Sequence, residues 1–164
     1  MDTKVVSMET IDERARAIPD LEAHLGYWLR RVSNSVSGTF ARALQERQTS
    51  VAEWVLMCEL HKRGQAAPAD LAGHLGMTRG AVSKVVDKLE AKGWVQTDAR
   101  DGDGRYRLLS LSRSGQRSLP QLAEIADQND SAHFSCLSVK EQVALRRLLM
   151  KISEHNSIEG VPTE

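Results

Sequence analysis

The sequence predicts a mainly α-helical protein that carries one small β-hairpin. Apolar residues recur every three or four positions along most of the 164-residue chain, which is the period of amphipathic helices. Serine and threonine residues stand where several of these stretches begin and can cap them. Residues 94–112 break the pattern with two β-like runs separated by a turn rich in Gly and Asp.

The N-terminal part is expected to be a flexible arm, residues 1–17, followed by a long helix assigned to residues 18–47. The arm is polar and has no clear apolar period. From Pro19 to about Arg47 the helical period continues unbroken, which predicts a helix roughly 40 Å long. Because such a helix is hard to bury in one small domain, it indicates a surface for a partner.

Two shorter helices follow. Ser50 and Glu53 have the spacing of a capping box, and the helix that they open should end near Gly64. Four of its residues are expected to face inward: Trp54, Val55, Cys58 and His61. Pro68 suits the first turn of the next helix and Gly76 its end. Its inner residues are Leu71, Ala72 and Leu75.

The stretch MTRGAVSKVVDKLEAKG, residues 77–93, predicts an amphipathic helix between a Thr78 cap and Gly93. Its apolar stripe is Val82, Val85, Val86 and Leu89, and its opposite face carries Arg79, Gly80, Ser83, Lys84, Asp87 and Lys88. Two strands, Trp94–Asp98 and Arg105–Ser112, then form a hairpin with Leu109 and Leu111 on one face. The order helix, turn, helix, hairpin predicts a winged helix-turn-helix over residues 48–113.

The C-terminal part, residues 114–155, predicts two more helices and ends in a tail, residues 156–164, that is expected to be disordered. Ser112 can cap the first helix, which should run to about Phe134. Pro120 inside it predicts a kink or a later start. The last helix opens with the capping box Ser138–Glu141. Its apolar residues are Val143, Leu145, Leu148, Leu149 and Ile152.

Charge and motif content narrow the possible functions. Residues 62–113 carry a net charge of +4, between flanks of −2 each, which favours a nucleic-acid partner. Two cysteines are too few for a disulfide framework, the N-terminus is too charged for a signal peptide, and no apolar run could span a membrane. A cytoplasmic protein is therefore expected. We find no phosphate-binding loop, catalytic motif or clustered metal ligands, so no enzyme, cofactor or metal is expected.

The charged face of residues 77–93 could simply be solvated. In a winged helix-turn-helix, however, the second helix lies in the major groove and its N-terminal residues meet the base edges. We therefore expect DNA contacts from Thr78, Arg79, Gly80, Ala81, Ser83, Lys84 and Lys88, with the two lysines on phosphates. Glycine at position 80 would remove bulk where the helix approaches DNA.

The stretch LAGHLGMTRGAVSKVVDKLEAKGWVQTDARDGDGRYRLLSLSRSG resembles the DNA-binding core of MarR-type bacterial transcription regulators. The similarity rests on the leucine-alanine helix, on Leu89–Gly93, on Asp103–Arg105 and on Leu111–Gly115, and the flanking helices fit it from about residue 20 to 155. It implies a homodimer on a pseudo-palindromic double-stranded operator, with the N- and C-terminal helices forming the dimer base. Arg105 matches the wing arginine that enters the minor groove and Asp103 the acid that orients it. Arg107 would contact phosphate or pair with Asp103.

The resemblance also implies a regulator, commonly a repressor, that a small ligand such as an aromatic acid releases from DNA. Candidate ligand-binding residues are His24, Tyr27, Trp28, Arg31, Trp54, Met57, Cys58 and His61. Tryptophans and an arginine suit an aromatic acid, but both tryptophans could equally be core. Two alternatives remain: a redox-responsive regulator that acts through Cys58, and a winged-helix module that binds protein instead of DNA.

Overall fold

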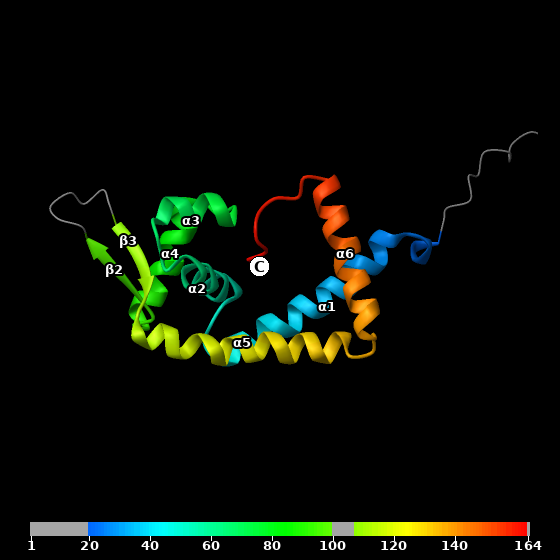
Figure 1. Cartoon of the computed structure of the whole chain (residues 1–164), viewed down its shortest axis with the longest axis horizontal. Coiled ribbons are helices and arrows are strands. Elements are labelled where there is room, and N and C mark those ends of the chain that lie inside the picture. Colours follow the sequence, from blue (N-terminus) through cyan, green and yellow to red (C-terminus); the bar gives the residue numbers. More distant parts are fainter. Residues whose placement is uncertain (1–19, 100–106, 164) are drawn as a thin grey trace, which may run out of the picture. The chain divides into compact units, whose positions relative to one another are not determined.

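The computed structural model describes residues 20–99 and 107–163, and over these it is mainly helical with one small sheet, as predicted (Figure 1). The chain forms two compact units, residues 1–34 and 35–164, which we describe separately. Among the described helices, none combines the length and the apolar character needed to cross a membrane.

The first unit contains a short 3-10 turn, η1 (Leu21–Ala23), and the beginning of α1 (Leu25–Glu46). The long helix therefore begins later than the apolar period predicts. His24 has an extended backbone, with φ −97° and ψ 124°, and this separates the turn from the helix. The Trp28 indole Nε1 donates a hydrogen bond of 2.9 Å to the Glu22 carbonyl, which links the 3-10 turn to α1.

The described residues of the second unit form the end of α1 and five further helices. These are α2 (Val51–Arg63), α3 (Pro68–Leu75), α4 (Arg79–Ala91), α5 (Arg113–Phe134) and α6 (Val139–His155). The predicted caps are confirmed: the side chains of Ser50, Thr78, Ser112 and Ser138 each accept a hydrogen bond from a first-turn amide. α5 continues through Pro120, so the alternative of a later start is wrong.

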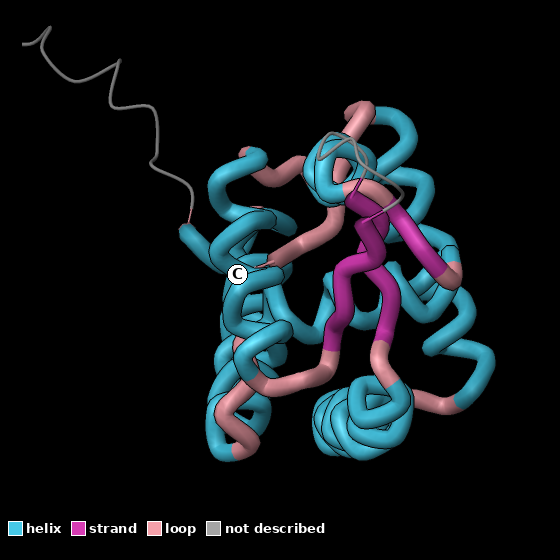
Figure 2. Tube along the Cα trace, turned by 90° about the vertical axis from the view of Figure 1, so that its left-hand side faces the viewer, coloured by secondary structure: helices cyan, strands magenta, loops and turns pink. Residues whose placement is uncertain are grey.

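The sheet has three antiparallel strands in the order β1-β3-β2, which Figure 2 shows side by side. They are β1 (Gln65–Ala66), β2 (Val95–Ala99) and β3 (Arg107–Leu111). Leu109 and Leu111 share the buried face of β3, as alternation predicts. The sequence predicts only the hairpin of β2 and β3. β1 is missed because a two-residue strand is too short to show alternation.

The hydrophobic core joins α2, α3, α4, the sheet, the end of α1 and the first half of α5. Leu56, Met57 and Leu60 on α2 are fully buried. Trp54 and Cys58 are only half-buried, and His61 is exposed, so its expected inward position is wrong. α2 turns the Leu56–Met57–Leu60 face to the core, and His61 lies in the last turn among basic residues that favour the negative helix end.

Residues 156–163, which the sequence predicts to be disordered, are described by the structure. Val161 and Thr163 are half-buried in it. The Ser153 carbonyl accepts the Ile158 amide at 3.0 Å, just beyond the end of α6. The α carbon of Gly160 lies close to Gly76, between α3 and α4.

Candidate DNA interface

The helix α4 separates its apolar and polar residues as the sequence predicts. Val82, Val85, Val86 and Leu89 are buried in the core. Six residues, Thr78, Arg79, Gly80, Ser83, Lys84 and Lys88, are exposed, and we call this set the reading face. The reading face offers a guanidinium, two ammonium groups and two hydroxyls, which are the groups that contact DNA phosphates and base edges.

Gly80 has no packing role within the described protein. A β-carbon built on it meets no heavy atom within 4 Å. Glycine is a poorer helix former than alanine, and no close contact within the described protein requires it in the first turn of α4. The open space above Gly80 would let the helix backbone approach a ligand outside the protein closely.

The N-terminal turn of α4 is held by its cap. Thr78 Oγ1 accepts a hydrogen bond of 3.1 Å from the Ala81 amide. That amide is therefore already bonded, and the Ala81 side chain is half-buried. Ala81 thus lies at the border of the reading face, and its amide is less available to DNA than the exposed side chains of its neighbours.

Both ends of α4 are fixed to the fold by tight turns. Before α4, Gly76 has φ +66°, and the Met77 amide donates to the Ala72 carbonyl at 3.0 Å. After α4, Gly93 has φ +67°, and the Trp94 amide donates to the Leu89 carbonyl at 2.9 Å. Positive φ suits glycine because it lacks a β-carbon.

The predicted wing residues are only partly described. Arg107 is exposed at the start of β3, where it is paired in register with Ala99 of β2. Asp103 and Arg105 lie outside the described residues. Their expected roles at the minor groove therefore remain predictions.

The expected ligand-binding residues divide between the two units. In the first unit, Tyr27 and Trp28 pack edge to face with ring centroids 5.3 Å apart. The Arg31 guanidinium lies 5.6 Å from the Trp28 ring centroid and within 3.4 Å of the Tyr27 hydroxyl. His24 is exposed. Three of the four thus form one local cluster on α1.

In the second unit, the expected ligand residue Trp54 lines a cavity of about 320 Å³. Met57 is fully buried, and His61 is exposed. The other lining residues come from α1, α2, α5 and the C-terminal segment: Val36, Ser37, Phe40, Val51, Val55, Ala126, Asn129, Asp130, Val161 and Pro162. Phe40 packs edge to face on Trp54, with centroids 6.4 Å apart. The sequence reading missed Phe40 because its helical spacing suits packing equally well.

Cys58 is unsuited to redox sensing. Burial raises the pKa of its thiol to about 11, with a further contribution from the neighbouring Glu59 carboxylate. The reactive species is the thiolate, which is scarce at neutral pH when the pKa is that high. Among the described residues, no group of three His, Cys, Asp or Glu side chains could hold a metal ion.

The core geometry defines a winged helix-turn-helix, with α3 and α4 as the helix pair and β2 and β3 as the wing. Residues 49–106 match the model of the MarR family. The chain is 24% identical over 141 residues to the transcriptional repressor NicR of Pseudomonas putida. The aligned region covers 86% of this chain and 89% of NicR. The region that matches the MarR family is thus the winged helix-turn-helix itself, and the similarity to NicR extends over most of the chain.

Solved structures show the same fold. A mutant MarR from E. coli complexed with operator DNA superposes with a TM-score of 0.67 and 22% identity, over 78% of this chain and 92% of that one. BpsR of Bordetella bronchiseptica, studied for regulation of its DNA binding by 6-hydroxynicotinic acid, gives a TM-score of 0.70 and 23% identity. That match covers 83% of this chain and 97% of BpsR.

Proposed function

We propose that this protein is a homodimeric repressor that binds a pseudo-palindromic operator through the reading face of α4 and the wing. The observation that carries the proposal is the division of α4 into a buried valine stripe and an exposed, donor-rich face with an open Gly80. In a winged helix-turn-helix this face enters the major groove. Repression is supported by the similarity to NicR, which is named a repressor.

Homodimer formation is supported by apolar side chains that the described residues leave exposed. α6 buries none of its residues. Its large apolar residues are all exposed: Val139, Val143, Leu145, Leu148, Leu149, Met150 and Ile152. In the first unit the same holds for Leu25, Trp28, Leu29 and Val32 of α1. So many exposed large apolar side chains on one helix are typical of an interface, so sedimentation is expected to give a dimer.

DNA binding is tested by a gel shift with the region upstream of the protein's own coding sequence. The double variant Lys84→Ala/Lys88→Ala should weaken binding at least tenfold and flatten the salt dependence, because two phosphate contacts are lost in each protomer. The matched control Lys62→Ala/Lys140→Ala removes the same charge from α2 and α6. Equal losses in both variants would contradict a specific role for the reading face.

We further propose that a small aromatic ligand, such as an aromatic acid, binds the cavity beside Trp54 and releases the operator. Two aromatic rings, Phe40 and Trp54, line it, and Ser37, Asn129 and Asp130 supply polar groups. The described lining contains no cation. Titrating salicylate and the uncharged salicylamide against tryptophan fluorescence therefore shows whether a carboxylate is recognised. A Trp54→Phe variant should lose the signal, and silence from both compounds in the wild type would count against the ligand class.

A further inference from the structure

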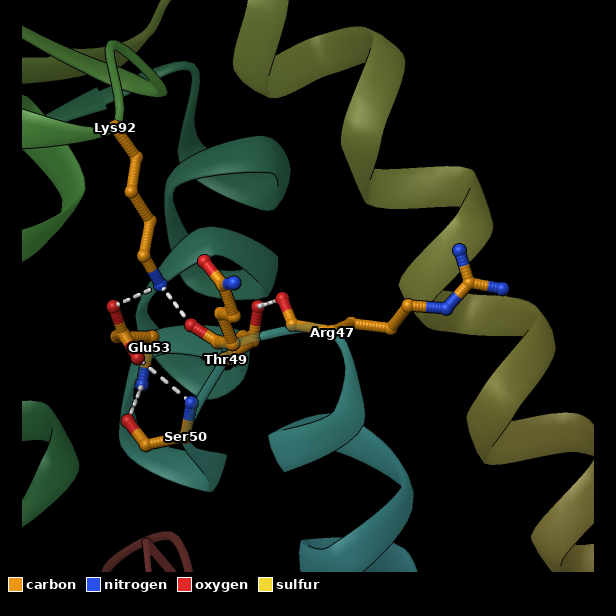
Figure 3. A network of polar contacts seen from close by, with 6 residues as sticks. Arg47, Thr49, Ser50, Glu53 and Lys92 are labelled. Carbon is orange, nitrogen blue, oxygen red and sulfur yellow. Dashed lines mark hydrogen bonds and ion pairs between the residues drawn. The ribbon is translucent and has the colours of Figure 1, made fainter.

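The C-terminal end of α4 is tied to α2, and to the segment between α1 and α2, by the side chain of Lys92, whose carboxylate partner is buried. The Lys92 ammonium donates to Glu53 Oε1 at 2.6 Å and to the Gln48 carbonyl at 2.5 Å (Figure 3). Glu53 is only 3% exposed. Lys92 caps α4, and its amide donates to the Lys88 carbonyl. One side chain therefore joins elements 39 and 44 residues apart in sequence.

The junction that receives Lys92 is itself held firmly. We call residues 47–50 the α1–α2 corner. The Thr49 amide donates to the Leu44 carbonyl at 3.0 Å, and the buried Thr49 hydroxyl donates to the Arg47 carbonyl at 3.1 Å. Gln48 has φ +53°, a left-handed conformation that is uncommon for residues with a β-carbon. The corner thus has one defined geometry.

Glu53 belongs to two contacts at once. Its Oε2 accepts the Ser50 amide at 2.7 Å and completes the capping box of α2, while its Oε1 accepts from Lys92. A carboxylate that is nearly fully buried costs free energy unless such partners satisfy it. The position of α4 and the start of α2 are therefore coupled through one carboxylate.

The corner also adjoins the cavities. Val51, next to the corner, lines both the cavity beside Trp54 and a neighbouring cavity. That second cavity is lined as well by Gln48, Ser50 and Glu53, so both acceptors of Lys92 belong to residues of its wall.

We infer that Glu53 and Lys92 are positioning residues for operator reading: they anchor the C-terminal end of α4 to the α1–α2 corner and so fix the angle at which the reading face meets DNA. The inference rests on the proposed function for its DNA readout. Base contacts require side chains held within roughly 0.5 Å of their productive positions, so a side-chain anchor at the end of α4 adds to the Gly76 and Gly93 turns and the buried valine stripe in holding the helix.

The test compares Glu53→Gln with Glu141→Gln. Both substitutions keep a hydrogen-bond acceptor in a capping box, but Glu141 caps α6 and has no ion-pair partner among the described residues. Glu53→Gln should speed amide hydrogen exchange in residues 88–92 and weaken operator binding about tenfold, with little change in binding to random DNA. Glu141→Gln should change neither.

Two substitutions of Lys92 distinguish the loss of the anchor from a general loss of stability. Lys92→Met keeps the length of the side chain but removes its charge and should reproduce Glu53→Gln, whereas Lys92→Arg should restore both readouts. If Glu53→Gln leaves the hydrogen exchange of α4 unchanged, Glu53 does not anchor the helix, whether or not the variant binds DNA. Faster exchange with unchanged operator affinity would overturn the role in reading. Failure of the wild type to bind its promoter DNA would instead contradict the proposed function.

Discussion

Gly115 lies against the carbonyl of Trp94 so closely that a β-carbon on Gly115 would be 2.1 Å from that oxygen. The contact joins the first turn of α5 to the end of the turn that follows α4. It is reinforced by the Ser112 amide, which donates to the same Trp94 carbonyl at 2.9 Å. Because the obstacle is backbone and not a movable side chain, only glycine fits at position 115 without a shift of α5.

Replacing Gly115 by alanine is therefore expected to destabilise the fold by about 2–3 kcal/mol, since α5 must move away from the wing. Chemical denaturation measures this. Gly73→Ala in α3 is the matched control, because a β-carbon there meets no atom within 4 Å, and it should leave stability unchanged or slightly raised. Equal stability of both variants would show that the approach of α5 to Trp94 is wrong.

Glu53 should make the stability of the folded protein depend on pH in the acidic range. Burial would raise the pKa of its carboxyl, but the hydrogen bonds from Lys92 and Ser50 outweigh burial and lower it. A lowered pKa in the folded state contributes stability that is present above the unfolded pKa and is lost as the pH falls through the folded one. Glu53→Gln should cost about 1–3 kcal/mol at neutral pH.

The difference in the free energy of unfolding between Glu53→Gln and the wild type should narrow as the pH falls. Protonated Glu53 has no negative charge and so loses its ion pair with Lys92. Urea denaturation from pH 7 to pH 3 measures the difference. A difference that stays constant over this range would contradict the ion pair.

Peroxide should not act through Cys58. Its thiol, with a pKa raised to about 11, stays protonated at neutral pH and reacts slowly. Cys58→Ser should leave any response of DNA binding to peroxide as in the wild type, and Ellman's reagent should label the exposed Cys136 first. Loss of a thiol-reversible peroxide response in Cys58→Ser alone would revive the redox alternative.

Arg105→Ala is expected to weaken operator binding tenfold or more while the dimer stays folded. The resemblance assigns Arg105 to the minor groove, where an inserted arginine contributes to affinity and shape recognition. DNA titration of both proteins measures the effect, and thermal melting with sedimentation checks the fold. Equal affinities would remove Arg105 from the interface.

Much of the fold was predictable because its signals are local. The capping boxes at Ser50 and Ser138 and the valine stripe of α4 depend only on residues a few positions apart, and all are confirmed. The inward position expected for His61 was wrong because apolar spacing on α2 fits two faces, and only packing against the core selects between them.

The features that the sequence could not reveal depend on residues far apart in the chain. β1 is defined by its pairing with β3 and not by its own composition. The contacts of Lys92 could not be predicted from its helix, because its partners Glu53 and Gln48 lie about 40 positions earlier in the chain. The cavity beside Trp54 likewise needs Phe40, Asn129 and Val161 to be brought together by folding.

The most direct test of the reading face is the substitution Gly80→Leu, because it separates folding from DNA binding. A β-carbon at position 80 meets no heavy atom within 4 Å in the described protein, and leucine is a better helix former than glycine, so thermal stability should be unchanged or raised. If α4 lies in the major groove with Gly80 against DNA, operator affinity in a gel shift should fall at least a hundredfold. Wild-type affinity in a stable Gly80→Leu protein would contradict the insertion of the reading face into the major groove.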